Sequence, residues 1–204
     1  MDIAIVDYGM GNVRSVQKAI EHIAPNDSVY LTDDKSIIDS SDRIVFPGQG
    51  AMGACMQALK QHDLIEIIKR TEHEKPFLGI CLGLQLLFDH SEENGGTDGL
   101  SLIPGKVVRF PESELKIPHM GWNTVQQAQA HPMWHQIKDG ARFYSVHSYY
   151  VQVQDPSVVA GTTNYGIDFT CAIAKDNLFA VQFHPEKSQH DGLQLLKNFV
   201  AWQP

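Results

Sequence analysis

The sequence has little of what would place it in several broad classes of protein. Its 204 residues include only three cysteines, Cys55, Cys81 and Cys171, which are too few and too widely spaced for a disulfide framework. No apolar run approaches the roughly 20 residues that cross a lipid bilayer. Basic residues number 16 against 24 acidic ones, and they are scattered singly. We therefore expect no disulfides, no contact with a membrane and no binding of nucleic acid.

The chain also lacks internal repeats, low-complexity stretches and any composition typical of a linker. Its hydrophobic content of 43% is ordinary for a globular protein. We therefore expect residues 1–204 to form one domain. The first residues enter an apolar strand pattern directly, without the charged head and apolar segment of a signal peptide, which predicts a cytoplasmic location.

Cys81 stands between two glycines in residues 79–83, whose sequence is GICLG. The apolar residues before it predict a strand, and residues 84–88 after it predict a helix. A nucleophile at such a sharp turn has a strained backbone, and flanking glycines let neighbouring chain approach closely. Free N–H groups at the start of the expected helix would favour a thiolate. The pattern therefore predicts a nucleophilic cysteine and not a structural one.

A second group of candidate residues lies about a hundred positions further along the chain. Residues 178–184 (LFAVQFH) predict a strand that ends at Pro185, because proline has no N–H to continue a ladder. In an extended segment His184 and Glu186 share one side, so that the carboxylate can hold the imidazole in a single tautomer. Cysteine, histidine and carboxylate in these places predict a catalytic triad.

A glycine-rich loop follows the strand predicted over residues 43–46. Gly48, Gln49 and Gly50 lie in its sequence PGQG, at the edge of the sheet where open α/β folds bind their ligands. Hydrolysis through a tetrahedral intermediate requires donors for an oxyanion. We expect the N–H of Leu82 to be one donor and this loop to supply the other.

Strand and amphipathic helix patterns alternate through the first half of the chain, which predicts parallel strands covered by helices. One of these helices carries Cys55 on its apolar stripe, which predicts a core position. After Gly95 and Gly96 shorter alternating strands follow, one of them containing Cys171, and a helix is expected from Asp191. The fold class predicted is α/β, with a mixed, mostly parallel central sheet, helices on both faces and a smaller antiparallel layer.

Two weaker patterns carry no prediction of a site. Gly9 and Gly11 begin a dinucleotide-binding pattern, but Arg14 occupies the place of its third glycine, so a turn with Asn12 as helix N-cap is the better interpretation. His131 and His135 are four residues apart, but Pro132 interrupts them and no thiol or carboxylate joins them. No metal site is expected.

Together, the segments GICLGLQ, PGQG and FHPE resemble the class I glutamine amidotransferases, and the resemblance covers the whole chain. It implies a flavodoxin-like fold and the hydrolysis of glutamine to glutamate and ammonia without a cofactor. Cys81 would attack the side-chain amide, His184 would move the proton and Glu186 would orient His184. Gln85 and Glu93 would hold the amino-acid end of the substrate. The opposite wall would be formed by Val146, His147 and Ser148.

Further segments, such as residues 118–123 (PHMGWN) and 146–150 (VHSYY), are similar to the branch of the family that serves imidazole glycerol phosphate synthase. That resemblance implies a heterodimer with a separate (β/α)₈ barrel cyclase, which receives the ammonia in histidine biosynthesis. Asn12, Trp122 and Lys187 match segments turned toward the partner, although Trp122 could equally be a core residue. We hypothesise that Lys187 couples occupancy of the partner to the loop from Gly48 to Gly50.

Two other functions remain open from the sequence. The chain could supply ammonia to a different synthase, such as one that uses chorismate. It could also be a non-catalytic module that regulates a partner by docking, although the presence of all three triad residues argues against this. A thiol peptidase or stress-protein relative would share the cysteine turn, but it gives no reason for the segment from His184 to Glu186.

Overall fold

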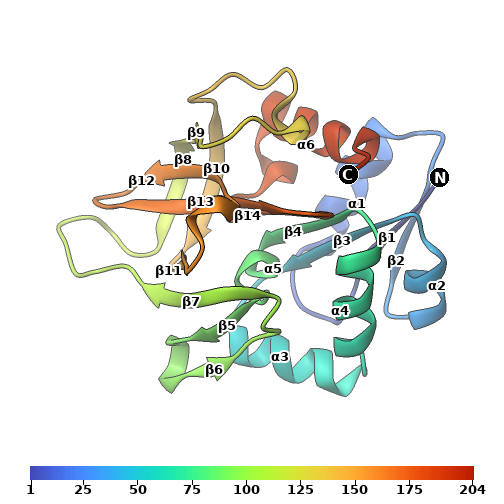
Figure 1. Ribbon diagram of the computed structural model, residues 1–204, viewed down its shortest axis with the longest axis horizontal. Coiled ribbons are helices and arrows are strands. Elements are labelled where there is room, and N and C mark those ends of the chain that lie inside the picture. Colours follow the sequence, from blue (N-terminus) through green and yellow to red (C-terminus); the bar gives the residue numbers. More distant parts are fainter.

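The computed structural model describes all 204 residues. Its centre is a sheet whose first half is parallel, in the order β2, β1, β3, β4, β14 (Figure 1). These strands span Ser28–Thr32, Asp2–Val6, Arg43–Gly48, Phe77–Cys81 and Leu178–Val181. The residues of β3, β4 and β14 are all buried, as expected for strands with a helical layer on each side.

The sheet continues beyond β14 through strands that are mainly antiparallel, in the order β13, β11, β7, β5, β6. They span Asp168–Lys175, Tyr149–Val153, Ile103–Arg109, Phe88–Ser91 and Thr97–Asp98. β12 (Val159–Asn164) pairs with β13 and with the short β9 (Gln126–Gln127). A separate two-stranded sheet joins β8 (His119–Thr124) to β10 (Arg142–His147).

Helices cover both faces of the parallel half (Figure 1). α1 (Val13–Ile23) and α6 (Gln189–Ala201) pack together on one face, where Ile3 and Ile5 point. α2 (Lys35–Ser40), α3 (Met52–Gln61) and α4 (Ile65–Glu74) lie on the other face with Ala4 and Val6. Alternate residues of one strand therefore feed two separate apolar clusters. The remaining helical elements are α5 (Leu82–Gln85) and four 3₁₀ turns, η1 (Glu93–Gly95), η2 (Pro132–Trp134), η3 (Pro156–Val158) and η4 (Pro185–Lys187).

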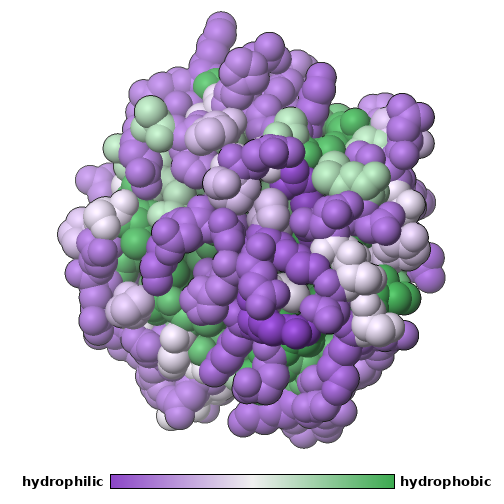
Figure 2. All heavy atoms as spheres, turned by 45° about the vertical axis from the view of Figure 1, so that its right-hand side comes forward, coloured by the Kyte–Doolittle hydropathy of each residue, from purple (hydrophilic) through white to green (hydrophobic).

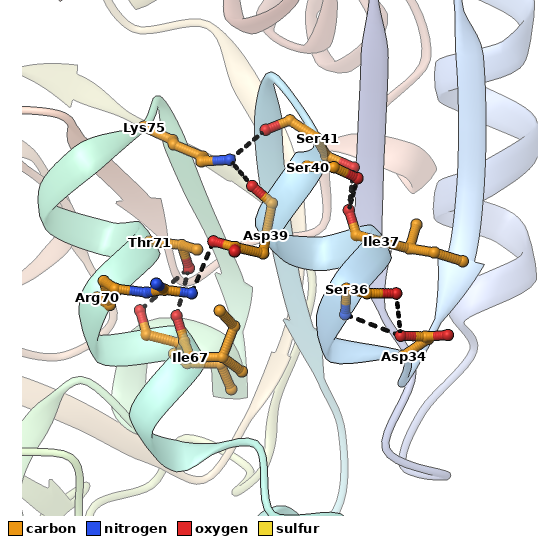
Figure 3. Close-up of polar contacts among 11 residues, drawn as sticks. Asp34, Ser36, Ile37, Asp39, Ser40, Ser41, Ile67, Arg70, Thr71 and Lys75 are labelled. Carbon is orange, nitrogen blue, oxygen red and sulfur yellow. Dashed lines mark hydrogen bonds and ion pairs between the residues drawn. The ribbon is translucent and has the colours of Figure 1, made fainter.

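The contact between α2 and α4 shows how the surface layer is held (Figure 3). The Asp34 carboxylate caps α2 by accepting from the Ser36 N–H at 2.8 Å. Arg70 on α4 pairs with Asp39 at 2.6 Å, and Lys75 donates to the carbonyl oxygens of Asp39 and Ser41. Underneath, Ile38 is fully buried. Polar contacts at the rim thus surround an apolar centre.

The predicted fold class is confirmed, and Cys55 and Cys171 are both buried in the core, as expected. Three local predictions are wrong. The helix after Cys81 is only four residues long, because the chain turns back into β5 at Phe88. Its dipole is correspondingly small. The strand before Pro185 ends at Val181, so that His184 lies beyond it. Asn12 makes no side-chain cap at α1; its backbone N–H bonds to the Gln49 side chain instead.

The parallel strands β1, β3, β4 and β14 bring four chain segments to the carboxyl edge of the sheet. These segments begin at Asp7, Gly48, Cys81 and Gln182. The candidate residues of the sequence are concentrated there, at the position where open α/β sheets bind ligands. None of the helices is both long and apolar enough to span a membrane.

Candidate active site

Cys81 has a backbone conformation that ordinary residues avoid, with φ 56° and ψ −110°. It is the last residue of β4 and lies opposite Gly48 in the register between β3 and β4. Gly83 makes this turn possible, because a β-carbon at that position would lie only 1.9 Å from the carbonyl oxygen of Phe46. A strained residue held by close backbone contacts is typical of a functional turn. The Cys81 side chain is directed toward a cavity and is 6% exposed.

His184 and Glu186 form a buried pair beside this turn. Nδ1 of His184 is 2.8 Å from Oε1 of Glu186, and their side chains are 2% and 1% exposed. The 3₁₀ turn η4 and not an extended strand brings them together. Since the carboxylate accepts from Nδ1–H, Nε2 of His184 is the nitrogen left for chemistry, and it has no hydrogen-bond partner in the chain.

The charge on His184 is set by opposing effects. Burial of the ring disfavours the imidazolium, but Cys81 and Glu186 outweigh it and raise the pKa of His184 to about 10. The neighbouring sulfur and carboxylate therefore favour the protonated form of the imidazole. An imidazolium next to a thiolate is the arrangement that nucleophilic cysteine enzymes use.

The turn that carries His184 is fixed from β10. The His184 N–H donates to the Tyr144 carbonyl at 2.8 Å. The Ser188 hydroxyl closes the loop by donating to the His184 carbonyl at 2.6 Å and accepting from the Tyr144 N–H at 2.9 Å. β10 continues into Val146 and His147, so the same strand positions the histidine and one wall of the cavity.

The loop over Pro47 to Gly50 is held from three directions. The buried Tyr8 hydroxyl donates to the Pro47 carbonyl at 2.9 Å, and the Cys55 thiol donates to the Gln49 carbonyl at 3.4 Å. From outside, the Gln49 side chain accepts from the Asn12 N–H at 3.2 Å. Gly48 has no room for a β-carbon, which would lie 2.6 Å from the Tyr8 oxygen.

A cavity of about 430 Å³ brings most of the candidate residues together, a size suited to a small ligand. Its lining includes Gln49 and Gly50 together with Cys81, Leu82 and His184, while Gly48 lies just outside in a small adjoining cleft. As the first residue of α5, Leu82 has an N–H without an intrahelical acceptor. The remaining walls include all five residues expected to contact substrate, Gln85, Glu93, Val146, His147 and Ser148.

Two of these five residues also hold the cavity's own shape. The Gln85 side-chain amide donates to the Tyr149 carbonyl at 3.1 Å and to Oε1 of Gln182 at 2.9 Å. Oε2 of Glu93 accepts from the Met52 N–H at the start of α3, at 2.6 Å. Both side chains therefore join segments that are far apart in sequence.

His147 belongs to a directed chain of hydrogen bonds behind the wall. Its Nδ1 lies 2.8 Å from the Tyr149 carbonyl, which only accepts, so this nitrogen carries the proton. Nε2 of His147 then accepts from Nδ1 of His119 at 3.0 Å, and Nε2 of His119 faces the Asn123 amide nitrogen at 3.3 Å. Burial lowers the pKa of His147 to about 3 and also lowers the pKa of His119. Both rings are neutral, and each has one tautomer.

Gln182 is a residue of the site that sequence reasoning missed. It is fully buried, accepts from Gln85, and places its amide nitrogen 3.8 Å from the Cys81 sulfur. The only signal was a polar residue inside an otherwise apolar run, LFAVQF. His119, Pro118 and Tyr149 were also not assigned to the site, although they line the cavity or support it.

Of the three residues expected at a partner interface, Asn12 and Lys187 share a cleft or cavity with triad residues, and Trp122 does not. Asn12 is exposed and shares the small cleft with Gly48, His184 and Glu186. Trp122 is 37% exposed and borders a shallow surface hollow next to residues 188–191. Lys187 lines the mouth of the main cavity. The face in Figure 2 is mainly hydrophilic, with apolar side chains in small scattered groups.

His131 and His135 do not belong to any group of three or more potential metal ligands, since the structure contains no such group. The His131 ring accepts from the Met133 N–H at 3.2 Å and packs against Phe179 and Trp202. The contacts of His131 are therefore those of a residue that supports local packing.

Comparison with known proteins gives matches along the whole chain. Residues 4–202 match the family model described as glutamine amidotransferase class-I. The chain is 54% identical to imidazole glycerol phosphate synthase subunit HisH of Thiobacillus denitrificans, covering 100% of this chain and 92% of the relative. It is also 54% identical to the protein of the same name from Aromatoleum aromaticum, covering 100% and 99%.

Solved structures agree at the level of the fold. A crystal structure of a glutamine amidotransferase matches with a TM-score of 0.70 at 13% identity, over 98% of this chain and 97% of that one. The glutaminase domain of CTPS from Trypanosoma brucei matches with a TM-score of 0.64 at 16% identity, over 100% and 95%. From the family match and the identity over its full length, this chain belongs to the class I glutamine amidotransferases.

Proposed function

We propose that this chain is the glutaminase subunit of an imidazole glycerol phosphate synthase. It hydrolyses L-glutamine to glutamate and ammonia through Cys81, His184 and Glu186, as a single domain over residues 1–204. The observation that carries the proposal is the strained Cys81 turn at the floor of a cavity beside the buried His184–Glu186 pair. The identity of 54% to two proteins named HisH supports the choice of synthase.

In the first half of the reaction, the Cys81 thiolate attacks the side-chain amide carbon of glutamine. The carbonyl oxygen becomes an oxyanion, which the Leu82 N–H and a peptide N–H of the Gly48–Gln49–Gly50 loop stabilise. The His184 imidazolium gives its Nε2 proton to the amide nitrogen, the C–N bond breaks, and ammonia leaves. A thioester on Cys81 remains. Glu186 holds His184 in the tautomer that this transfer requires.

In the second half, neutral His184 takes a proton from water through Nε2. The resulting hydroxide attacks the thioester carbon, the C–S bond breaks, and glutamate is released with Cys81 as thiolate again. In the pocket, Gln85 and Glu93 hold the amino-acid end of glutamine, and Val146, His147 and Ser148 form the opposite wall. Their places around one cavity support these roles.

The ammonia passes to a separate (β/α)₈ barrel cyclase, which forms a heterodimer with this chain and closes the imidazole ring. The products are imidazole glycerol phosphate and an aminoimidazole carboxamide ribotide. The surface around Asn12, Trp122 and Lys187 faces the partner, and Lys187 couples the partner to the loop. We also propose that the protein works in the cytoplasm. Its three cysteines are all free thiols, consistent with a reducing compartment.

The test measures glutamate release by the purified chain alone, and again with a purified cyclase and its ribulosyl nucleotide ligand. We expect weak activity alone, a large increase in the complex, and a loss of at least about 1,000-fold in Cys81→Ala. Strong activity that ignores the cyclase would overturn the assigned partner. If Lys187→Ala left the ligand-stimulated increase intact, the coupling role of Lys187 would be rejected.

The same assay separates the alternatives. A glutaminase that serves a chorismate-using synthase would respond to that enzyme and not to the cyclase. A docking module would show no glutamate release in any mixture and no covalent labelling of Cys81 by a glutamine-like electrophile. The cavity next to Cys81 favours an enzyme over such a module.

A further inference from the structure

Helix α3 begins directly after the loop from Pro47 to Gly50, and it lacks a cap of its own. Its N-cap residue is Ala51, which has no side-chain acceptor, and its first turn contains no acidic residue. Alanine is among the poorest N-cap residues. The missing acceptor comes from 41 positions away, where Oε2 of Glu93 accepts from the Met52 N–H at 2.6 Å. A carboxylate at this place also complements the positive end of the helix.

The chain is shaped to deliver Glu93 to that position. Asn94, Gly95 and Gly96 have consecutive positive φ angles of 52°, 90° and 108°, which reverse the backbone tightly after Glu93. The Ser91 hydroxyl oxygen accepts from the Glu93 N–H at 3.2 Å. On the other side Gly53 allows close packing, since a β-carbon there would lie 3.1 Å from the Thr97 hydroxyl. The turn and the start of α3 therefore fit against each other.

Glu93 also lines the cavity that contains Cys81, Gln49 and Gly50. Only its Oε2 accepts a hydrogen bond from the chain, and Oε1 makes none. One carboxylate thus connects two things: the first N–H of the helix that follows the glycine-rich loop, and the interior of the substrate cavity. A carboxylate oxygen can accept more than one bond, so both connections are compatible.

We propose that Glu93 is a positioning residue for the Pro47–Gly50 loop, in addition to any contact it makes with substrate. Its bond to Met52 fixes the end of the loop nearest the cavity, while Tyr8 and Cys55 fix the loop from the core side. Recognition of an ammonium group on Oε1 and placement of the loop's oxyanion donor thereby depend on the same side chain. This inference rests on the proposed glutaminase function, and it deepens that function.

Glutaramate, which is glutamine without its α-amino group, separates the two roles. If Glu93 only bound the amino group, its replacement would not affect the hydrolysis of glutaramate. We expect Glu93→Ala in the complex with cyclase to lower kcat/KM for glutaramate about tenfold, whereas Glu93→Gln, which keeps an oxygen acceptor for Met52, stays within about threefold of the wild type. With glutamine, both variants raise KM. Equal glutaramate hydrolysis in all three proteins would overturn the proposal.

Hydrogen exchange gives a test that does not depend on activity. In the full-length chain, amides of residues 47–56 should exchange at least about fivefold faster in Glu93→Ala and in the milder Glu93→Asp, but not in Glu93→Gln. The matched control is Glu92→Ala, because Glu92 is an exposed neighbour whose carboxylate lies 3.9 Å from Lys106. Unchanged exchange in the alanine and aspartate variants would refute the tether. Absence of glutamine hydrolysis by the wild-type complex would instead refute the proposed function.

Discussion

The α2–α4 contact and the Cys81 cavity satisfy their polar groups in opposite ways. At this contact Arg70 of α4 pairs with Asp39 of α2, and within α4 the Thr71 hydroxyl donates to the Ile67 carbonyl (Figure 3). In and next to the cavity, Nε2 of His184 and Oε2 of Glu186 are buried without a partner in the chain. Backbone strain is also found there, at Cys81.

This difference follows from what each region does. A buried polar atom without a partner costs about 1–3 kcal/mol, and a strained residue costs a similar amount. Such costs persist where the atoms are needed for binding or chemistry. Because the α2–α4 contact is half exposed, its ion pair adds little to stability and its polar groups simply remain hydrated or paired. Buried atoms without a partner also occur elsewhere, in Arg43, Glu72, Trp134 and Thr163, so it is their combination with backbone strain at Cys81 that distinguishes the cavity region.

Replacing Glu186 should show the contrast between the two regions most clearly, because it should lower activity greatly and stability little. Glu186→Gln removes the charge that supports the His184 imidazolium, so the pKa of His184 falls and kcat drops at least about 100-fold. The melting temperature should change by less than about 5 °C, since the packing is nearly unchanged. Glutamate release in the complex and calorimetry measure the two effects. A variant whose melting temperature falls by much more than about 5 °C while its kcat stays near the wild-type value would contradict the comparison.

The buried His147 predicts a dependence of stability on pH. Its pKa is about 3 in the folded protein and about 6.5 in an unfolded chain, so the folded state binds fewer protons between these values. The contribution to stability is present above pH 6.5 and is lost as the pH falls toward 3. Titration of His147 alone should lower the free energy of unfolding by up to about 1.4 kcal/mol for each unit that the pH falls within this range.

Denaturant unfolding at several pH values tests this with His147→Gln, which does not titrate. Between about pH 6 and 4, the free energy of unfolding of this variant should depend less steeply on pH than that of the wild type. The difference in slope should be about that expected for one proton. His190→Gln is a suitable control, because His190 is 86% exposed at its side chain. Parallel curves for all three proteins would show that His147 does not titrate on unfolding.

The smallest effect is expected at the α2–α4 contact. Arg70→Ala removes the partner of Asp39, but both side chains are about half exposed, at 50% and 47%. We expect a loss of no more than about 1 kcal/mol in the free energy of unfolding, and no change in glutamate release. Denaturant titration and the glutaminase assay give the two values. A loss of several kcal/mol would mean that surface pairing matters as much as the buried site.

The sequence allowed the central features of the site to be predicted because their signals are local. Glycines on both sides of Cys81 identify a turn, and the spacing of His184 and Glu186 identifies a pair. The parallel strands and the helix carrying Cys55 are also visible from apolar periodicity. The structure places Cys81, His184 and Glu186 together because β4 and β14 are adjacent in the sheet.

Other features depend on contacts that no local pattern contains. Gln182 is part of the site because Gln85 and Cys81 are beside it in space. The helix after Cys81 was expected to include residues 84–88, but it ends at Gln85, and Phe88 instead begins β5, which pairs with β7. Helix α2 was missed, because only Ile38 of its six residues is buried. The Glu93 cap of α3 joins positions 41 residues apart.

The crowding at Gly83 has a consequence for how this site can change by mutation. The carbonyl oxygen of Phe46 occupies the space of a β-carbon at Gly83, so the shape of the turn is imposed by residues other than Cys81. This close contact does not involve the side chain at position 81. The turn therefore tolerates Cys81→Ser, which exchanges the sulfur for oxygen. Any side chain at position 83 would instead clash with the Phe46 carbonyl oxygen. At this turn it is Gly83, and not Cys81, whose identity the packing of the fold requires.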